Sequence, residues 1–317
     1  MKSAARLANT AVGHARNFYR NSTHAADARE GQKNIVQALP DRALEPALRK
    51  EIKTYATKHF GSKAFAPWLE TYAAWRGEFV EGCLPDNYHN QYVVPHAMGP
   101  HVGTLRNTLA RRILETDRLP DIGYILHGRL YDVDAKPVDI TSFQRAAFAK
   151  HPHVYVKAAK SLQGLGVQRA SANNLAQIVA KTKNAVIQYP VEVHPDLAAL
   201  SYEAATTIRI TTVLDKDGPR PVASFLRTGR PSETHIKADT EINFIVAIET
   251  GDVAAKAMLG KWQPISRHPD TGAPFQSVRI PAFDEMKAQA VELHARIPQY
   301  LYLGWDATVT PSSDIMF

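Results

Sequence analysis

The stretch "TTIRITTVLDKDGPRPVASFLRTG", residues 206–229, constrains the fold more than any other part of the chain. Two runs rich in β-branched residues flank "DKDGPR", and Asp and Gly tolerate the backbone conformations that a tight turn requires. The pattern therefore predicts a hairpin of two antiparallel strands. Because helical and strand patterns are mixed along the rest of the chain, the sequence predicts the α+β class with antiparallel sheet.

Residues 1 to about 80 carry apolar side chains at helical spacing, which predicts a helical N-terminal region. An aromatic stripe continues this spacing and is more typical of a packed core than of a cofactor site. The stripe consists of Trp68, Tyr72, Trp75 and Phe79. Pro, Asn and Gly interrupt the periodicity in the segment that follows, so we place a domain boundary near residue 95.

Elements of both kinds follow this boundary. A helix is predicted over about residues 104–117, and Asp139 or Thr141 can serve as the N-cap of a later helix. Two short strands around a turn are predicted in "DIGYILHGRLYDVDAKPVDI". The other predicted strands are "HVYVKAA", "NAVIQYPVEV" and "YLYLGWDATVT", and the other predicted helices are "TSFQRAAFAKHP", "SANNLAQIVAKTK" and "AFDEMKAQAVELHARI".

Charge and composition limit the partners of the protein. The formal net charge is +7 and the pI is about 9.3, so anionic partners are favoured. The basic residues are spread along the chain and form no Lys/Arg block, which argues against a nucleic-acid partner. No apolar run approaches the roughly 18 residues of a membrane span, which leaves only peripheral association with a membrane open.

The single cysteine, Cys83, cannot form an internal disulfide, so a reducing cytoplasm is the simplest location. Because no motif surrounds it, we interpret Cys83 as a packed or idle thiol rather than a nucleophile. The first 26 residues contain no Asp or Glu, a composition that resembles an organelle transit peptide. A basic first helix is the simpler interpretation, and we adopt it.

The stretch "VYVKAAKSLQGLGV", residues 154–167, is the first candidate for a binding site. A strand delivers Lys157 and then opens into a loop with Ser161, Gly164 and Gly166. Glycines let a backbone fold closely around an anion, so that its N–H groups can point at phosphate oxygens. The loop is neither a P-loop nor a GxGxxG motif, and taken alone it is more typical of an ordinary strand-to-helix connection.

Three charged residues lie in strand patterns, where a charge needs a partner. Arg209 stands inside an otherwise uncharged strand, and it either forms a buried structural ion pair or faces a cleft and holds an anionic group. Arg227, on the facing strand of the hairpin, favours a shared basic surface. Asp306 in "YLYLGWDATVT" requires a pairing partner or a metal ion, and a lone strand carboxylate is more often a structural partner.

The order of these parts resembles the sugar-transfer-associated ATP-grasp family. The matching stretches are the strand ending at Lys157 with its glycine loop, "IQYPVEVHP", "TTIRI", "LRTG", "HPDTGAPF", "IPAFDEM" and "LGWDATVTP". They cover residues 150–317 well and residues 95–150 loosely. The resemblance implies an ATP-grasp fold of the α+β class, in which two subdomains with antiparallel sheets sandwich ATP, behind a helical N-terminal region.

The resemblance also implies the domain limits. The helical N-terminal region would span residues 1–95, and the ATP-grasp domain would span residues 96–317. Within this domain, a small subdomain would cover about 120–190 and a large subdomain about 191–317.

The resemblance implies a nucleotide site around Lys157, which would contact the ATP phosphates from the end of its strand. Ser161, Gly164 and Gly166 would form a flexible lid over the β- and γ-phosphates. Arg106 falls where such proteins usually have another ATP-binding lysine.

The segment after the next strand would hold the nucleoside. Gln188 and Tyr189 would line the adenine, mainly through backbone groups, and Glu192 is a candidate for contact with the ribose. Arg209 and Arg227 would act as catalytic residues that face the phosphates or the substrate carboxylate.

The resemblance makes Asp306 a Mg²⁺ ligand. In this family the strand after Gly-Trp-Asp turns through a short hairpin and reaches a Glu-x-Asn with the remaining metal ligands. Phe317 is the residue just before that position, so we expect a further C-terminal segment to supply them. The Asp-Asn and Gly-Gly stretch expected after the "LRTG" motif is not recognisable in "SETHIKADTEINF", where Asp239 and Asn243 are candidate remnants.

Together these features predict an ATP-dependent ligase that uses ATP and Mg²⁺. It would join a small-molecule or glycan-linked carboxylate to an amine through an acyl-phosphate, in polysaccharide, cell-surface or natural-product biosynthesis. Two alternatives stay open. One is a catalytically inactive ATP-grasp-like partner protein that binds a nucleotide or glycan, and the other is a kinase that uses the same ATP site.

Overall fold

The computed structural model describes residues 2–99, 108–159, 166–201, 206–231, 233, 236–237 and 240–317. The chain divides into two compact units. The first unit is Met1–Ala97 with Lys261–Pro264, and the second is Met98–Gly260 with Ile265–Phe317. Among the helices of these residues, none combines the length and the apolar character that a membrane span requires.

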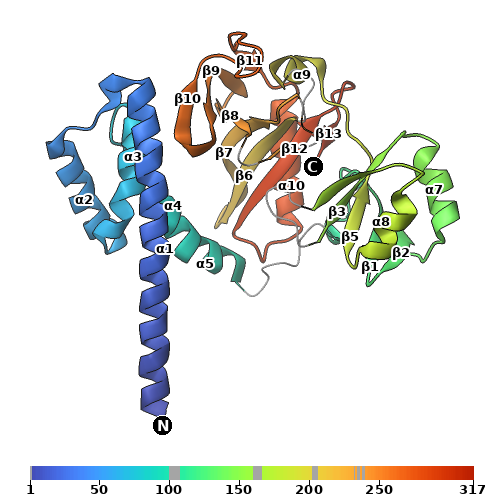
Figure 1. Cartoon of the computed structure of the whole chain (residues 1–317), viewed down its shortest axis with the longest axis horizontal. Coiled ribbons are helices and arrows are strands. Elements are labelled where there is room, and N and C mark those ends of the chain that lie inside the picture. Colours follow the sequence, from blue (N-terminus) through green and yellow to red (C-terminus); the bar gives the residue numbers. More distant parts are fainter. Residues whose placement is uncertain are drawn as a thin grey trace. The chain divides into compact units, whose positions relative to one another are not determined.

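The first unit is built of helices (Figure 1). They are α1 (Lys2–Ala38), a 3₁₀ turn (Pro40–Arg42), α2 (Pro46–Phe60), a second 3₁₀ turn (Lys63–Phe65), α3 (Ala66–Arg76), α4 (Asp86–Tyr88), a π-helical turn (His89–Val93) and α5 (Val94–Met98). Helices α2 and α3 end at Gly61 and Gly77, both in the left-handed conformation that glycine adopts without strain. The predicted helical N-terminal region is confirmed.

The aromatic stripe on α3 surrounds a tryptophan from a distant part of the sequence. The ring centroid of Trp262 lies 5.9 Å from that of Trp68, 5.6 Å from that of Tyr72 and 6.2 Å from that of Trp75. Trp262 also packs against α1, where a Cβ placed on Gly31 would lie 3.0 Å from its side chain. The stripe is therefore part of a packed core, as the sequence predicts.

The second unit contains a five-stranded sheet in the order β2-β1-β5-β3-β4. Its strands are β1 (Asp121–Leu126), β2 (Arg129–Asp132), β3 (Val154–Ala158), β4 (Val167–Ala170) and β5 (Ala185–Gln188). Helices α7 (Ile140–Phe148) and α8 (Leu175–Lys181) share an apolar core with these strands (Figure 1). The N-cap of α7 is Asp139, which accepts a hydrogen bond from the Ser142 N–H at 2.9 Å, so one of the two predicted caps is confirmed.

The helix predicted over residues 104–117 is shorter than expected. Only α6 (Ala110–Ile113) is helical in the described part of this range, and residues 100–107 lie outside the description. The helix ends because Glu115 takes a left-handed backbone conformation, with φ of 48°, which a right-handed helix cannot continue.

An eight-stranded sheet has the order β10-β9-β8-β7-β6-β12-β13, with β11 paired to β9. Its strands are β6 (Thr206–Asp215), β7 (Gly218–Thr228), β8 (Ile242–Val246), β9 (Asp252–Leu259), β10 (Gln263–Ile265), β11 (Val278–Arg279), β12 (Tyr302–Val309) and β13 (Ile315–Met316). A 3₁₀ turn (Gly260–Trp262) joins β9 to β10. In the sequence, helix α9 (Pro195–Ser201) precedes β6, and helix α10 (Phe283–Ala295) lies between β11 and β12.

Every strand pair whose register the structure gives is antiparallel. The predicted hairpin is formed by β6 and β7, which are in register from Thr206 opposite Thr228 to Asp215 opposite Gly218. The prediction of the α+β class with antiparallel sheets is therefore confirmed.

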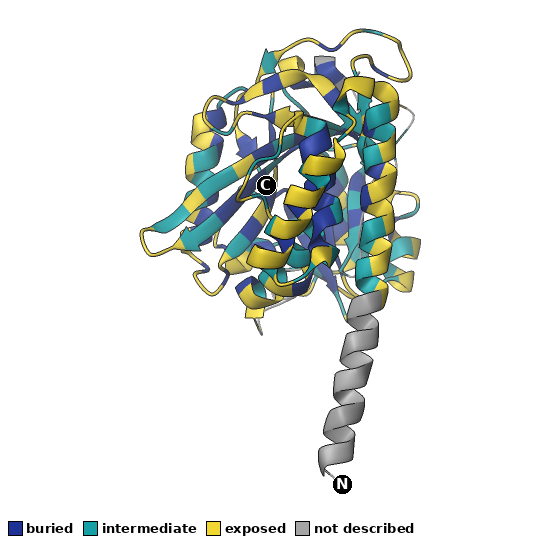
Figure 2. Ribbon diagram, turned by 90° about the vertical axis from the view of Figure 1, so that its left-hand side faces the viewer, coloured by how far each residue is buried: buried dark blue, intermediate teal, exposed yellow. Residues whose placement is uncertain are grey.

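Alternation along the strands gives the large sheet two different faces (Figure 2). Ile208, Ile210 and Leu226 are fully buried and share one apolar core with residues of α10, among them Met286. Successive side chains of a strand point to opposite faces, so the residues between these apolar ones project from the other side of the sheet. Arg209 is one of them, and the polar face is therefore a consequence of the core.

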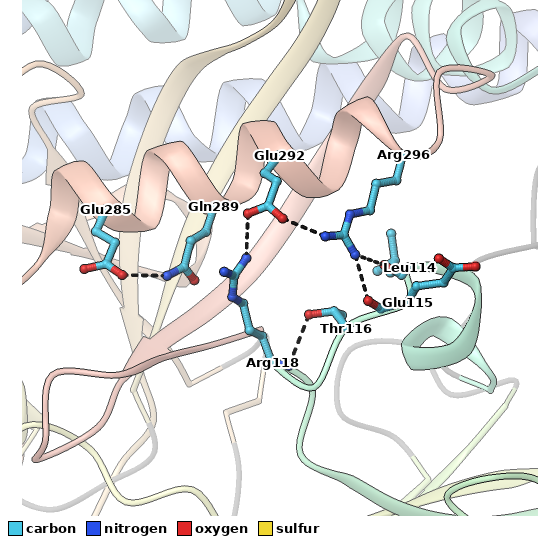
Figure 3. A network of polar contacts seen from close by, with 8 residues as sticks. All are labelled: Leu114, Glu115, Thr116, Arg118, Glu285, Gln289, Glu292 and Arg296. Carbon is cyan, nitrogen blue, oxygen red and sulfur yellow. Dashed lines mark hydrogen bonds and ion pairs between the residues drawn. The ribbon is translucent and has the colours of Figure 1, made fainter.

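A polar network holds the segment before β1 against α10 (Figure 3). Arg296 Nη1 donates hydrogen bonds to the carbonyls of Leu114 at 2.6 Å and Glu115 at 2.7 Å. Glu292 accepts from Arg296 Nη2 at 2.6 Å and from Arg118 Nη1 at 2.9 Å. The network therefore connects the segment that leads into β1 of the small sheet with α10, the helix that packs on the large sheet.

The chain turns through a hairpin after β12, as the resemblance implies. Val309 pairs with Ile315 in the antiparallel β12–β13 ladder. The backbone N–H of Phe317 donates to the Arg118 carbonyl at 2.8 Å. The Phe317 ring centroid lies 5.8 Å from that of Trp305, so the last residue packs on the strand that carries the Gly-Trp-Asp motif.

We expect replacement of Trp262 by alanine to loosen the helical unit, because three rings of α3 would lose their shared neighbour. Trp262 is only partly buried, so the loss should be about 2 kcal/mol, below the 3–5 kcal/mol of a fully buried aromatic residue. Amide hydrogen exchange in α3 should become faster in Trp262→Ala and change much less in Trp262→Phe, which keeps a ring in place. Unchanged α3 protection in Trp262→Ala would contradict this role.

Candidate functional site

Three neighbouring strands of the large sheet bring Asp306, Arg209 and Arg227 together. Asp306 on β12 lies opposite Arg209 on β6, and Arg227 comes from β7, the next strand. Arg209 donates from Nε to Asp306 Oδ1 at 2.7 Å and from Nη2 to Oδ2 at 3.0 Å. Arg227 Nη2 donates to the same Oδ1 at 2.7 Å. One carboxylate is thus shared by two guanidinium groups.

The Gly-Trp-Asp motif explains how Arg209 reaches the carboxylate. A Cβ on Gly304 would lie 2.7 Å from Arg209 Nη1, so the glycine leaves the space that the guanidinium crosses. Trp305 points to the opposite face, where it is buried and donates from Nε1 to Thr212 Oγ1 at 2.8 Å. Because side chains alternate between the two faces of a strand, Asp306 lies on the same face of the sheet as Arg209. Each residue of the motif therefore has a separate role: Gly304 leaves space for the guanidinium, Trp305 packs in the core and Asp306 accepts hydrogen bonds from arginine.

The charge on Asp306 is stabilised by its partners. Burial alone would raise the pKa of Asp306, but the charges and hydrogen bonds of Arg209 and Arg227 outweigh it, so the pKa lies below the ordinary value. The side chain is 46% exposed. Asp306 is therefore an ionised carboxylate at neutral pH that remains accessible.

Glu241 belongs to the same cluster, and the sequence analysis missed it. Its Oε2 lies 3.7 Å from Arg227 Nη1, and its Oε1 accepts a hydrogen bond from Asn243 Nδ2 at 3.2 Å. Burial raises the pKa of Glu241, against the opposing charge of Arg227. Asn243 lies opposite Arg227 in the β7–β8 register, which places Glu241, two residues earlier, near Arg227. The sequence carries no signal for this pairing.

Lys157 adds a third cation to this region, from the small sheet. It lies on β3 and is partly buried. Burial lowers the pKa of Lys157, and the negative charges of Asp121 and Asp306 oppose this effect. The predicted phosphate-binding lysine and the predicted carboxylate are therefore close enough to interact electrostatically, although they belong to different sheets.

Asp121 at the start of β1 is a second residue that the sequence did not single out. Its Oδ1 accepts a hydrogen bond from Gln188 Nε2 at 2.7 Å, and the side chain of Tyr124 also interacts with this carboxylate. Burial raises the pKa of Asp121, against the Gln188 hydrogen bond and the charges of Arg111 and Lys157. This carboxylate is a further negative charge beside Lys157.

The predicted adenine segment follows β5. The side chain of Gln188 is committed to Asp121, and the N–H of Tyr189 donates to the Pro120 carbonyl at 3.0 Å. The Tyr189 ring stacks on His151 with a centroid distance of 5.2 Å and an interplanar angle of 8°. The Gln188 side chain and the Tyr189 N–H are thus engaged within the protein, and the adenine role of both residues stays a prediction.

Other predicted residues are placed only in part. Glu192 is exposed in the segment between β5 and α9, and Gly166 directly precedes β4 with φ of 90°, a value that favours glycine. The predicted residues that lie outside the described part of the chain are Arg106, Ser161, Gly164 and the candidate remnant Asp239. Their predicted roles stay predictions.

The His-Pro-Asp-Thr-Gly stretch forms a turn with its own ion pair. The His268 N–H donates to the Ala273 carbonyl at 2.8 Å, and the Gly272 N–H donates to the His268 carbonyl at 2.8 Å. Asp270 accepts two hydrogen bonds from the guanidinium of Arg230, just beyond the end of β7. The motif therefore links the β10–β11 connection to the strand that carries Arg227.

The described residues do not fit a Mg²⁺ ion. Mg²⁺ prefers about six oxygen ligands in near-octahedral geometry, and no group of three His, Cys, Asp or Glu residues gathers anywhere in the described ranges. Both oxygens of Asp306 already accept hydrogen bonds from arginine. The role of Asp306 as a metal ligand stays a prediction.

Acid should weaken the fold partly through Asp306. Because the folded-state pKa is lowered, the ionised carboxylate stabilises the fold above the unfolded value of about 3.9, and this contribution disappears as pH falls through the folded-state pKa. Urea unfolding between about pH 6 and pH 3 should therefore depend on pH less steeply in Asp306→Asn than in the wild type. The exposed Asp217→Asn serves as the control. An identical pH dependence in Asp306→Asn and the wild type would contradict the assignment.

Solved structures with some similarity to the chain include a biotin carboxylase and a D-alanine–D-alanine ligase. Biotin carboxylase from Campylobacter jejuni, in a β-γ-ATP complex, is 13% identical with a TM-score of 0.39, and the match covers 68% of this chain and 40% of that one. The D-alanine–D-alanine ligase from Coxiella burnetii is 8% identical with a TM-score of 0.37, covering 67% and 45%. The chain spans less than half of the length of either protein. No curated protein matches the sequence.

A family comparison agrees with the order of motifs. The model of the sugar-transfer associated ATP-grasp family matches residues 169–317, a range that includes Arg209, Arg227, Glu241 and Asp306. Lys157 and its glycine loop lie before the matched range. The predicted family is confirmed over residues 169–317, the part of the chain that matches the model of the sugar-transfer associated ATP-grasp family.

Proposed function

We propose that the chain belongs to an ATP-dependent ligase that joins a carboxylate to an amine. The observation that supports this most is the pair of guanidinium groups of Arg209 and Arg227 on Asp306, with Lys157 of the other sheet near enough for the negative charge of Asp306 to act on its pKa. Three cations from two sheets suit a polyphosphate chain that lies between them, since phosphates are bound by such charge-assisted hydrogen bonds. The family match supports ATP as the nucleotide.

The proposed reaction has two steps. A carboxylate oxygen of the substrate attacks the γ-phosphorus of ATP, the bond from this phosphorus to the β–γ bridging oxygen breaks, and ADP leaves. The amine nitrogen then attacks the carbonyl carbon of the acyl-phosphate, inorganic phosphate leaves, and the amine gives up a proton. Lys157, Arg209 and Arg227 would orient the phosphates and neutralise their charge, which is most of what phosphoryl transfer asks of a protein.

The finer parts of the proposal rest on the family and the composition. The family name suggests a substrate carboxylate that is small or linked to a glycan, in polysaccharide, cell-surface or natural-product biosynthesis. The single Cys83 favours the cytoplasm. The Mg²⁺ predicted from the sequence would need oxygen ligands besides Asp306.

A second candidate is an inactive partner protein that binds a nucleotide without turnover. The observation in its favour is that both oxygens of Asp306 are taken by arginine. Such a protein would keep the cationic cluster and its affinity for phosphates, but it would not catalyse the ligation.

A screen for ADP release separates these candidates. With Mg²⁺, ATP and a panel of carboxylate and amine pairs, we expect ADP release that needs both substrates and yields an amide. A phosphate ester formed on a hydroxyl would instead identify a kinase. Tight nucleotide binding with no ADP release across the panel would contradict the ligase and favour the inactive partner.

Lys157→Ala should weaken ATP binding by about 2 kcal/mol or more, the scale of a lost charge-assisted contact in a partly buried site. Isothermal titration calorimetry measures the change directly. Lys216→Ala is the matched control, because the side chain of Lys216 is 87% exposed at the turn of the β6–β7 hairpin. Equal ATP affinity in Lys157→Ala and the wild type would remove this lysine from the site.

A further inference from the structure

Apolar side chains lie directly beside the arginine cluster, on the same face of the large sheet. Arg209 on β6 lies opposite Asp306 on one side and opposite Phe225 of β7 on the other. Phe225 in turn lies opposite Ile245 of β8. Residues that lie opposite one another in a ladder share a face of the sheet. Charged and apolar side chains therefore form one continuous row across four strands.

The apolar part of this row is open to solvent. Ile245 is 53% exposed, whereas the preceding residue, Phe244, is buried in the core on the other face. Phe225 is partly buried, and Ala223, two residues earlier and therefore on the same face, is exposed. We call Ala223, Phe225 and Ile245 the apolar patch. An exposed apolar patch beside charged residues is typical of a binding surface.

Arg209 presents an unused N–H group next to the apolar patch. Its Nε and Nη2 donate to Asp306, whereas Nη1 has no hydrogen-bond partner within the described ranges of the chain. Nη1 lies over Gly304, where a Cβ would be 2.7 Å away from it. Gly304 is exposed, and the Arg209 side chain is 30% exposed. The two hydrogen bonds to Asp306 thus hold the guanidinium with one donor turned toward an accessible part of the sheet.

We propose that the apolar patch binds the aliphatic or aromatic group of a substrate whose carboxylate accepts a hydrogen bond from Arg209 Nη1. This inference rests on the proposed ligase function, because it names the class of carboxylic acid that the same site takes. Asp306 stays bound to both arginines and keeps Arg209 in place. From β6 to β8 the distance is two strand spacings, about 10 Å, so one small molecule can contact both Arg209 and the patch.

The size and the setting of the patch favour a small molecule. Two large apolar side chains and one alanine cover much less than the roughly 800 Å² that each partner buries in a stable protein interface. The guanidinium at the edge of the patch suits a carboxylate, because hydrogen bonds between charged groups are stronger than neutral ones. An apolar carboxylic acid matches both features.

Methyl NMR on protein with labelled isoleucine methyl groups tests where such a molecule binds. Hexanoate is the probe, acetate lacks its chain, and hexanamide lacks its charge. We expect hexanoate to shift the Ile245 signal, which is identified by its loss in Ile245→Thr. The signal of Ile113 on α6, which is 36% exposed and lies outside the sheet, is the internal control and should stay in place.

Ligand-observed NMR titrations give the affinities. Hexanoate should bind about tenfold more tightly than acetate, because its methylene groups leave water. It should also bind about tenfold more tightly than hexanamide, because only the carboxylate forms a charge-assisted hydrogen bond. Ile245→Thr, which keeps the β-branch that suits a strand, should lower hexanoate affinity about threefold and leave acetate affinity unchanged. Leu301→Thr, at a 40% exposed residue just before β12, should change neither affinity.

Four results would overturn the inference. They are an unshifted Ile245 signal, equal affinities for hexanoate and acetate, equal affinities for hexanoate and hexanamide, and unchanged hexanoate affinity in Ile245→Thr. Sedimentation of the wild type and Ile245→Thr covers a different occupant of the patch. A dimer that Ile245→Thr converts to a monomer, without hexanoate binding, would identify a second copy of the chain and would also overturn the inference.

The outcome is separable from the fate of the proposed function. If hexanoate binds at Ile245 but the ADP-release screen finds no ligation, the apolar carboxylate site stands and the ligase proposal falls. If the screen finds ligation of small polar carboxylates while hexanoate leaves the Ile245 signal unshifted, the ligase stands and the role of the apolar patch is wrong.

Discussion

Two guanidinium groups share the carboxylate of Asp306 across three adjacent strands of the large sheet. Because a charged strand residue needs a partner, this contact lets β6, β7 and β12 carry arginines and an aspartate on the face opposite the apolar core. That core, with Ile208, Ile210 and Leu226 against α10, fixes which residues alternate to the polar side. The apolar core on one face of the sheet therefore determines that the charged cluster lies on the other face.

Much of the fold could be predicted from local patterns. The turn residues of "DKDGPR" and the alternation in "TTIRITTVL" were sufficient for the β6–β7 hairpin, and the N-cap of α7 is one of the two predicted candidates, Asp139. The helix over residues 104–117 was predicted too long, because periodicity does not reveal a left-handed residue such as Glu115. Local propensity is overridden where the backbone must turn toward another element, here α10.

The candidate site could be predicted only as a set of separate residues. Arg209, Arg227 and Asp306 were recognised as charges that need partners, but their sharing of one carboxylate depends on strand order, which the sequence does not state. The electrostatic effect of Asp306 on Lys157 acts between two sheets, and Glu241 lies in a stretch without a recognisable motif. Contacts between residues far apart in the chain leave little trace in a single sequence.

The central claim is that one polyphosphate site is formed by Lys157 together with Arg209 and Arg227. A crystal structure with a non-hydrolysable ATP analogue tests it most directly. The account predicts that phosphate oxygens lie within hydrogen-bond distance of Lys157 Nζ and of at least one of the two guanidinium groups. A nucleotide bound elsewhere, with Asp306 still held by both arginines and no phosphate near Lys157, would contradict it.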